Sequence, residues 1–141
     1  MACCPKSIIA EILKAKGAIK SVYFVACGGS YAGLHPGKYF LESESKELKV
    51  DHYSSNEFCH ATPKSLGENS IVITQSSSGN TPETVKAAEI AQKAGAASIV
   101  ITNKPESPLA QNGDYVLVPE KGSTANSGQA YSLKLAVEIL N

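Results

Sequence analysis

The sequence contains no arginine and no tryptophan, and these absences limit what the chain can bind. All 13 basic residues are lysines, and 13 acidic residues balance them to a formal net charge of zero. A domain that binds nucleic acid normally carries a clear basic excess, so the composition predicts no nucleic-acid partner. A phosphate site in this chain cannot use an arginine fork and would depend on main-chain N–H groups, hydroxyls or lysine.

Long apolar runs and closely spaced cysteine pairs are missing as well. No apolar stretch approaches the ~20 residues that cross a bilayer, which predicts no membrane partner. The opening residues, MACCPKS, lack the basic and apolar segments of a secretory signal, so we expect a cytoplasmic protein. The four cysteines include no C-x-x-C pair, and reduced thiols are therefore expected rather than a metal site.

What is present indicates one α/β domain, because 141 residues suffice for a single core and are too few for two. Short β-branched apolar runs alternate with stretches of helical periodicity, which is typical of a parallel sheet covered by helices on both faces. We expect a flavodoxin-like three-layer αβα fold with a five-stranded, mainly parallel sheet. The predicted strands are residues 22–26, 47–53, 70–74, 98–102 and 115–119; the predicted helices are 7–16 within an N-terminal segment 1–17, 31–43, 82–94, a single turn in 107–113, and 127–141.

A glycine-rich turn, ACGGS, follows the first predicted strand. Gly28 and Gly29 leave the backbone open to a close ligand, and Ser30 is expected to open the next helix. Ligands of open α/β sheets bind outside the carboxyl ends of the strands, which is where this turn would lie. The turn is therefore a candidate binding segment.

A hydroxyl-rich turn, SSSGNT at residues 76–81, follows the third predicted strand, with Thr81 as the expected N-cap of the helix that Pro82 begins. A helix N-terminus offers unpaired N–H groups and a partial positive charge, which suit a phosphate. The hydroxyls of Ser76, Ser78 and Thr81 would complete its cradle. Serine and threonine are also ordinary turn residues, so a structural role stays open, but two such turns after buried strands favour a ligand site.

The residues of both turns resemble a known family. The segments YFVACGGSYA and ITQSSSGNTPETVKAAEIAQKAGA are similar to the signature segments of the sugar isomerase (SIS) domain, which occurs in glucosamine-6-phosphate synthase and related phosphosugar proteins. The YFVACG strand, the EFC…TP segment at 57–63 and the SP pair at 107–108 resemble the fructosamine and fructoselysine 6-phosphate deglycases more closely. The resemblance covers roughly residues 18–120, and the serine turn is its most specific part.

The resemblance implies a sugar-phosphate ligand, such as fructose 6-phosphate or a fructosamine 6-phosphate, and neither a metal nor a cofactor. Phosphate contacts would come from the serine turn, and the glycine turn would face the sugar. Ser77 stands where the synthases often have glutamine. The implied binding set consists of Gly28, Gly29, Ser30, Ser76, Ser77, Ser78 and Thr81.

One part of the family pattern is missing from this chain. Enzymes of this family usually carry two SIS domains in tandem, and the glutamate and histidine that move protons lie in the second, in a segment similar to ESGEFRHGP. No such segment occurs here. We therefore expect residues 1–141 to form a single SIS domain that resembles the first half of a tandem protein, completed by a second SIS domain or by a second copy in a homodimer.

Isomerisation and deglycation of a phosphosugar both remove a proton beside a carbonyl or imine carbon and return it elsewhere. Glu57 and His35 are the catalytic candidates in this chain. Glu57 follows the second predicted strand within the deglycase-like segment, and His35 stands near a helix start, from which it could reach a neighbouring subunit. His52, His60 and Glu120 are further ionisable side chains in the chain.

Three functions stay open from the sequence alone. The first is half of an enzyme that acts on a fructosamine 6-phosphate or a similar phosphosugar. The second is a non-catalytic module that senses a phosphosugar. The third is a dinucleotide-binding α/β domain, which Asp51 in the second predicted strand keeps possible although CGGSYAG departs from the G-x-G-x-x-G pattern.

Overall fold

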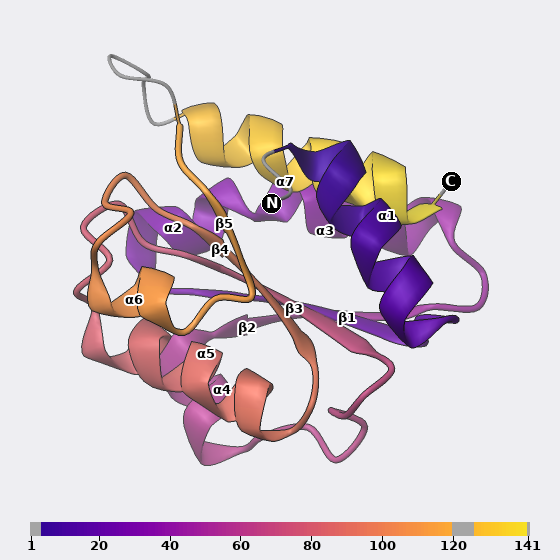
Figure 1. The fold of residues 1–141 in the computed structure, drawn as a ribbon, viewed down its shortest axis with the longest axis horizontal. Helices are drawn as coiled ribbons and strands as arrows, with labels where there is room; N and C mark the ends of the chain where they lie inside the picture. The colour runs from indigo at the N-terminus through magenta and orange to yellow at the C-terminus, as the bar shows by residue number, and fades with distance from the viewer. Residues whose placement is uncertain (1–3, 120–125, 141) are drawn as a thin grey trace.

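A computed structural model describes residues 4–119 and 126–140 of the chain. Five parallel strands form one sheet in the order β2-β1-β3-β4-β5, which confirms the expected flavodoxin-like arrangement (Figure 1). The strands are β1 (Ser21–Ala26), β2 (Lys49–Ser54), β3 (Ser70–Gln75), β4 (Ala97–Ile101) and β5 (Tyr115–Leu117). The central strands are buried along their whole length because helices cover both faces of the sheet.

Helices form the two outer layers (Figure 1). One face of the sheet carries α1 (Pro5–Lys16), α2 (Gly28–Gly33), α3 (His35–Glu44) and α7 (Asn126–Leu140). The other face carries α4 (Ser55–His60), α5 (Pro82–Lys93) and α6 (Pro108–Gln111). None of the described helices is both long and apolar enough to span a bilayer.

The core consists of two apolar layers, one on each side of the sheet. Because successive strand residues point to opposite faces, Phe24 and Ile73 contact the α1–α3–α7 layer, whereas Tyr23 and Val72 contact the α4–α5 layer. All four side chains are fully buried. These layers hold the carboxyl ends of the strands in a fixed arrangement, and the candidate site lies at those ends.

The prediction of a single helix over residues 31–43 is wrong. The chain forms α2, which already begins at Gly28 rather than Ser30, and then α3, with Leu34 between them. Pro36 explains the break, since proline lacks an N–H donor and its ring collides with the carbonyl of the preceding turn inside a helix. In the structure Pro36 occupies the first turn of α3, where neither penalty applies.

Candidate functional site

The polar turns lie side by side at the carboxyl edge of the sheet. The strand register pairs Ala26 of β1 with Ser54 of β2 on one side and with Gln75 of β3 on the other. Gln75 in turn pairs with Ile101 of β4. The segments that follow these strands therefore start next to one another, at the point between β1 and β3 where the strand order reverses, which is the usual ligand position in such sheets.

Hydroxyl groups at both ends of the serine loop, residues 76–81, contact each other. Ser76 Oγ lies 3.0 Å from Thr81 Oγ1 and also accepts a hydrogen bond from the Gly79 N–H at 3.2 Å. The Ser76–Thr81 bond uses one of the two hydroxyl hydrogens, whichever residue donates. The second hydrogen has no acceptor among the described residues, so one of the two hydroxyls retains a donor for a ligand.

The middle of the serine loop and the start of α5 add further donors. Ser77, Ser78 and Asn80 are exposed. Ser78 Oγ accepts a hydrogen bond from the Asn80 N–H at 3.2 Å. The Ser78 hydroxyl hydrogen has no acceptor among the described residues and can be donated to a ligand. Thr81 occupies the N-cap position of α5 as predicted, but its side chain makes no cap hydrogen bond and contacts Ser76 instead. The first N–H groups of α5 therefore keep their capacity to bind an anion.

The segment after β4 holds the serine loop in place from behind. Ser77 O accepts a hydrogen bond from Asn103 N at 3.2 Å, and Gly79 O accepts one from Leu109 N at 3.1 Å. Gly79 has a φ of 70°, and a Cβ at this position would overlap the side chain of Ser107. A glycine is therefore required at position 79 by the fold itself.

The glycine turn presents an open surface beside the serine loop. Gly28 and Gly29 are exposed, and a Cβ on either residue would meet no atom of the described chain within 4 Å. Gly28 has a φ of 55°, which accounts for its glycine. Gly29 has no positive φ and no close neighbour, so no contact within the described chain requires glycine at this position. Ser30, the next residue of α2, is half-buried.

A buried hydrogen-bond chain joins three of these segments beneath the site, and it was not foreseen from the sequence. Ser55 Oγ and Thr84 Oγ1 lie 2.7 Å apart, and Thr84 donates to Cys27 Sγ at 3.8 Å. The three residues belong to the starts of α4 and α5 and to the turn after β1. The sequence does contain one signal for this contact: all three residues stand just after a predicted strand or in the first turn of a helix, and these positions meet at one edge of a parallel sheet.

The acid–base candidates are not brought together in the described chain. Glu57 is exposed in the first turn of α4, where its charge also suits the helix dipole. His35 is exposed in the first turn of α3, on the opposite face of the sheet. His60 is exposed at the end of α4, and Glu120 lies outside the described residues.

His52 has a different environment from the other two histidines. Its ring stacks on Tyr31 of α2 with the centroids 3.9 Å apart, and its buried Nε2 atom has no hydrogen-bond partner. Burial lowers the pKa of His52 to about 4, because the imidazolium loses hydration beneath α2. The imidazole is therefore neutral near pH 7.

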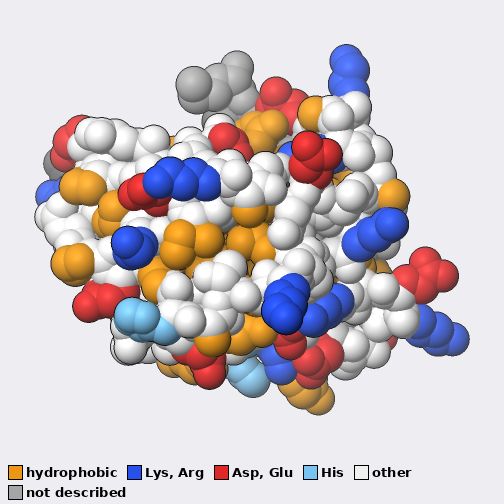
Figure 2. Space-filling model, turned by 90° about the horizontal axis from the view of Figure 1, so that it is seen from below, with side chains coloured by type: hydrophobic (Ala, Val, Ile, Leu, Met, Phe, Trp, Pro, Cys, Tyr) orange, Lys and Arg blue, Asp and Glu red, His pale blue; other side chains and the backbone are white. Residues whose placement is uncertain are grey.

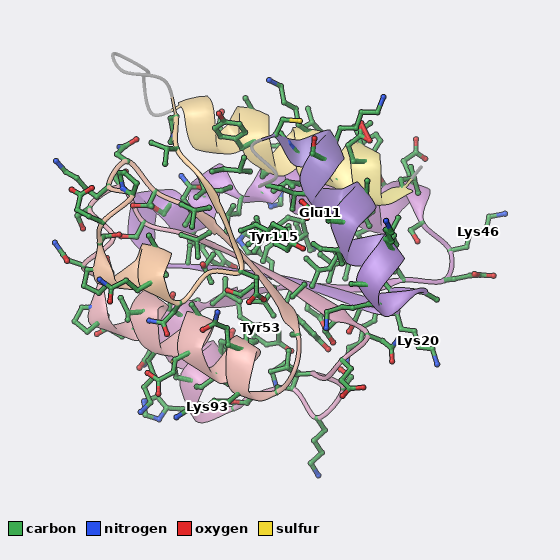
Figure 3. The ribbon with its side chains drawn as sticks, viewed as in Figure 1. Glu11, Lys20, Lys46, Tyr53, Lys93 and Tyr115 are labelled. Carbon is green, nitrogen blue, oxygen red and sulfur yellow. The ribbon has the colours of Figure 1, made fainter. Side chains whose placement is uncertain are left out.

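Charged side chains, and side chains of the types that bind metals, also occur away from the polar turns. Lysines and acidic side chains are mixed over the face seen in Figure 2, without a field of one sign. A cavity of about 520 Å³ lies at the amino ends of β4 and β5, where Tyr115 and Glu11 line it together with Lys16 and Asp114 (Figure 3). This end of the sheet is opposite the polar turns. Within residues 4–119 and 126–140, no three His, Cys, Asp or Glu side chains are placed to hold a metal, and Cys4, Cys27 and Cys59 are free thiols.

Comparisons with known proteins show which proteins the chain resembles. The chain is 54% identical over 107 residues to the fructosamine deglycase FrlB of Bacillus subtilis strain 168, covering 76% of this chain and 33% of the relative. It is 35% identical over 134 residues to an isomerizing glutamine–fructose-6-phosphate aminotransferase of Geobacillus kaustophilus HTA426, covering 94% of this chain and 21% of the relative. The chain thus spans a third or less of the length of these relatives.

A solved structure extends the likeness to the fold. A Salmonella typhimurium LT2 protein assigned as a phosphosugar isomerase superposes with a TM-score of 0.88 at 48% identity, covering 96% of this chain and 42% of that one. The sequence profile of the SIS domain matches residues 18–138, which is most of the chain. The resemblance seen in the two polar turns is therefore confirmed, and the chain belongs to the SIS domain family.

Proposed function

We propose that this chain is the phosphosugar-binding SIS domain of an isomerase or deglycase that acts on fructosamine 6-phosphate-type substrates. The serine loop grips the phosphate through the hydroxyls of Ser76, Ser78 and Thr81 and through the first N–H groups of α5. The open backbone of Gly28 and Gly29, with Ser30, faces the sugar, and Ser77 lies at the rim of the phosphate cradle.

The observation that carries this proposal is the Ser76–Thr81 hydroxyl pair. One hydroxyl hydrogen of the pair remains free to bind a ligand beside the N-terminus of α5, which has no side-chain cap. Asn103 and Leu109 hold the loop in position by hydrogen bonds. Donors arranged in this way suit a doubly charged phosphate ester without arginine. The choice of a fructosamine 6-phosphate is supported by the 54% identity to a fructosamine deglycase.

Proton transfer needs groups that the described chain does not assemble. Glu57 and His35 lie on helices on opposite faces of the sheet, so they do not act here as one acid–base pair. The proposal therefore places the main acid and base outside this chain, in a second SIS domain or in the partner of a homodimer. Glu57 and His35 stay secondary catalytic candidates, each of which would act on a ligand in a site that this partner completes.

Binding of fructose 6-phosphate, measured by calorimetry and by thermal shift, tests the phosphate assignment. Ser76→Ala and Thr81→Val should each weaken binding by about tenfold or more, since a hydrogen bond to a charged group contributes ~1.5–3 kcal/mol. Ser43→Ala, on the exposed end of α3, is the matched control and should bind as the wild type does.

The same assay separates the alternatives. Unchanged affinity in both loop variants would contradict the phosphate assignment. Stabilisation by NAD without stabilisation by fructose 6-phosphate would favour the dinucleotide-binding domain instead. A sensing module and an enzyme half both bind the sugar phosphate, and only the enzyme half gains turnover of a fructosamine 6-phosphate when its tandem domain is present.

A further inference from the structure

Three buried polar side-chain atoms lack a hydrogen-bond partner among the described residues, and two of them lie directly against α2. They are Gln75 Oε1 and His52 Nε2; the third, Thr74 Oγ1, faces the opposite side of the sheet. A Cβ on Gly33 of α2 would meet the Gln75 amide at 3.5 Å, and Tyr31 of α2 stacks on His52. An unpartnered buried polar atom is a cost to the folded state that calls for a reason.

Gln75 stands out because its neighbours on the same face of β3 are apolar. Ile71 and Ile73 point to the same layer and belong to its hydrophobic core. Gln75 itself is 9% exposed and is the last residue of β3, next to Ser76 of the serine loop. A leucine or isoleucine would fill this position without leaving an unpaired oxygen, so the amide must serve something other than packing.

The helix that covers Gln75 has few features that would hold it in place. Three of the six residues of α2 are glycine, and its N-cap residue, Cys27, makes no side-chain cap hydrogen bond. Glycine weakens a helix by roughly 0.5–1 kcal/mol per residue relative to alanine. Four of the six residues of α2 are exposed, so little apolar contact opposes a displacement of the helix.

We propose that Gln75 is a sugar-contacting residue that α2 covers in the free protein. This inference rests on the proposed function of the serine loop. When a sugar phosphate enters with its phosphate at Ser76, α2 moves outward and the amide oxygen of Gln75 accepts a hydrogen bond from a hydroxyl of the sugar. The bond satisfies the orphan acceptor only in the complex, so Gln75 contributes to the recognition of the sugar and not of the phosphate.

The test compares two ligands and two variants of the full chain. Gln75→Leu should weaken the binding of fructose 6-phosphate by about tenfold, leave the binding of inorganic phosphate unchanged, and raise the Tm of the free protein by removing the orphan oxygen. Thr74→Val is the matched control: it also removes a buried, unpartnered oxygen, so it should raise the Tm, but it should leave both affinities unchanged because Thr74 faces the α4–α5 layer.

Hydrogen exchange supplies a readout of α2 itself. The exchange rates of the α2 amides should change on addition of fructose 6-phosphate and stay the same with inorganic phosphate. An unchanged ratio of the two affinities in Gln75→Leu, or an equal loss of both, would overturn the role of Gln75 while leaving the phosphate site intact. If the wild type binds neither ligand, the proposed function of the serine loop is itself wrong, and the role of Gln75 is lost with it.

Discussion

The hydroxyl oxygens of Ser76 and Thr81 lie 3.0 Å apart although they stand at opposite ends of the loop between β3 and α5. Their contact joins the two ends of the loop beside the N-terminus of α5. Each hydroxyl is therefore placed by the other as well as by its own backbone. A ligand that binds one of them depends on both.

This contact predicts that the two loop substitutions are not additive. Ser76→Ala and Thr81→Val should each lower fructose 6-phosphate affinity, and the double variant should lose less than the sum of the single losses by about 0.5–1.5 kcal/mol. A double-mutant cycle by calorimetry measures this coupling. Strictly additive losses would show that the two hydroxyls act independently.

Gly79→Ala should be among the most destabilising glycine substitutions in the chain. The new Cβ combines a φ of 70° with overlap of Ser107, so we expect a loss of about 2–4 kcal/mol in the free energy of unfolding. Gly28→Ala is the matched control, because Gly28 has a similar φ of 55° but open space in front of it, and should cost only about 1 kcal/mol.

Urea denaturation of both variants measures the difference. Equal losses in the two variants would mean that the contact with Ser107 does not constrain the serine loop. A larger loss in Gly79→Ala than in Gly28→Ala, together with weaker phosphate binding by Gly79→Ala, would show that this contact sets the geometry of the cradle.

Most of the fold follows from local patterns that the sequence displays. Short β-branched apolar runs such as SIVIT are typical of strands in a sheet with both faces covered, and helical stretches between them favour parallel pairing. The serine loop was equally visible, because four of its six residues carry a hydroxyl group, more than a turn requires. The break between α2 and α3 was not predicted, because Pro36 is compatible either with a kink in one helix or with the first turn of a second helix, and the sequence does not decide between them.

Details of the site depend on contacts between distant segments and could not be predicted. The need for glycine at position 79 comes from Ser107, 28 residues further along the chain. The bond from Thr84 to Cys27 and the position of Gln75 beneath Gly33 arise only when β1 and β3 pair. Sequence periodicity does not predict these contacts, because each of them depends on how distant segments pack in three dimensions.

The buried contact between Ser55 and Thr84 predicts a large effect of removing one partner. Thr84→Val should cost about 1–3 kcal/mol of folding stability, since it leaves the Ser55 hydroxyl buried without its partner. Adding Ser55→Ala to that variant should recover part of the loss, because no orphan polar group then remains. Thermal and urea unfolding of the three variants test this, and a further full loss in the double variant would contradict it.

The half-buried imidazole of His52 predicts that the protein loses stability on mild acidification. Burial lowers the folded-state pKa of His52 from 6.5 to about 4, so between these values the unfolded chain binds more protons than the folded one. The free energy of unfolding should therefore fall as the pH is lowered from 6.5 towards 4. The side chain is about half-exposed to solvent screening, and the expected loss is roughly 1–2 kcal/mol.

Urea titrations at pH 7 and pH 4.5 measure this loss, and replacement of His52 isolates its share. His52→Gln should flatten the pH dependence, because glutamine keeps a polar side chain beneath Tyr31 but takes up no proton. His60→Gln, at the exposed end of α4, is the matched control and should leave the dependence in place. If both variants lose stability on acidification as the wild type does, carboxylates rather than the imidazole beneath α2 govern the acid sensitivity of this domain.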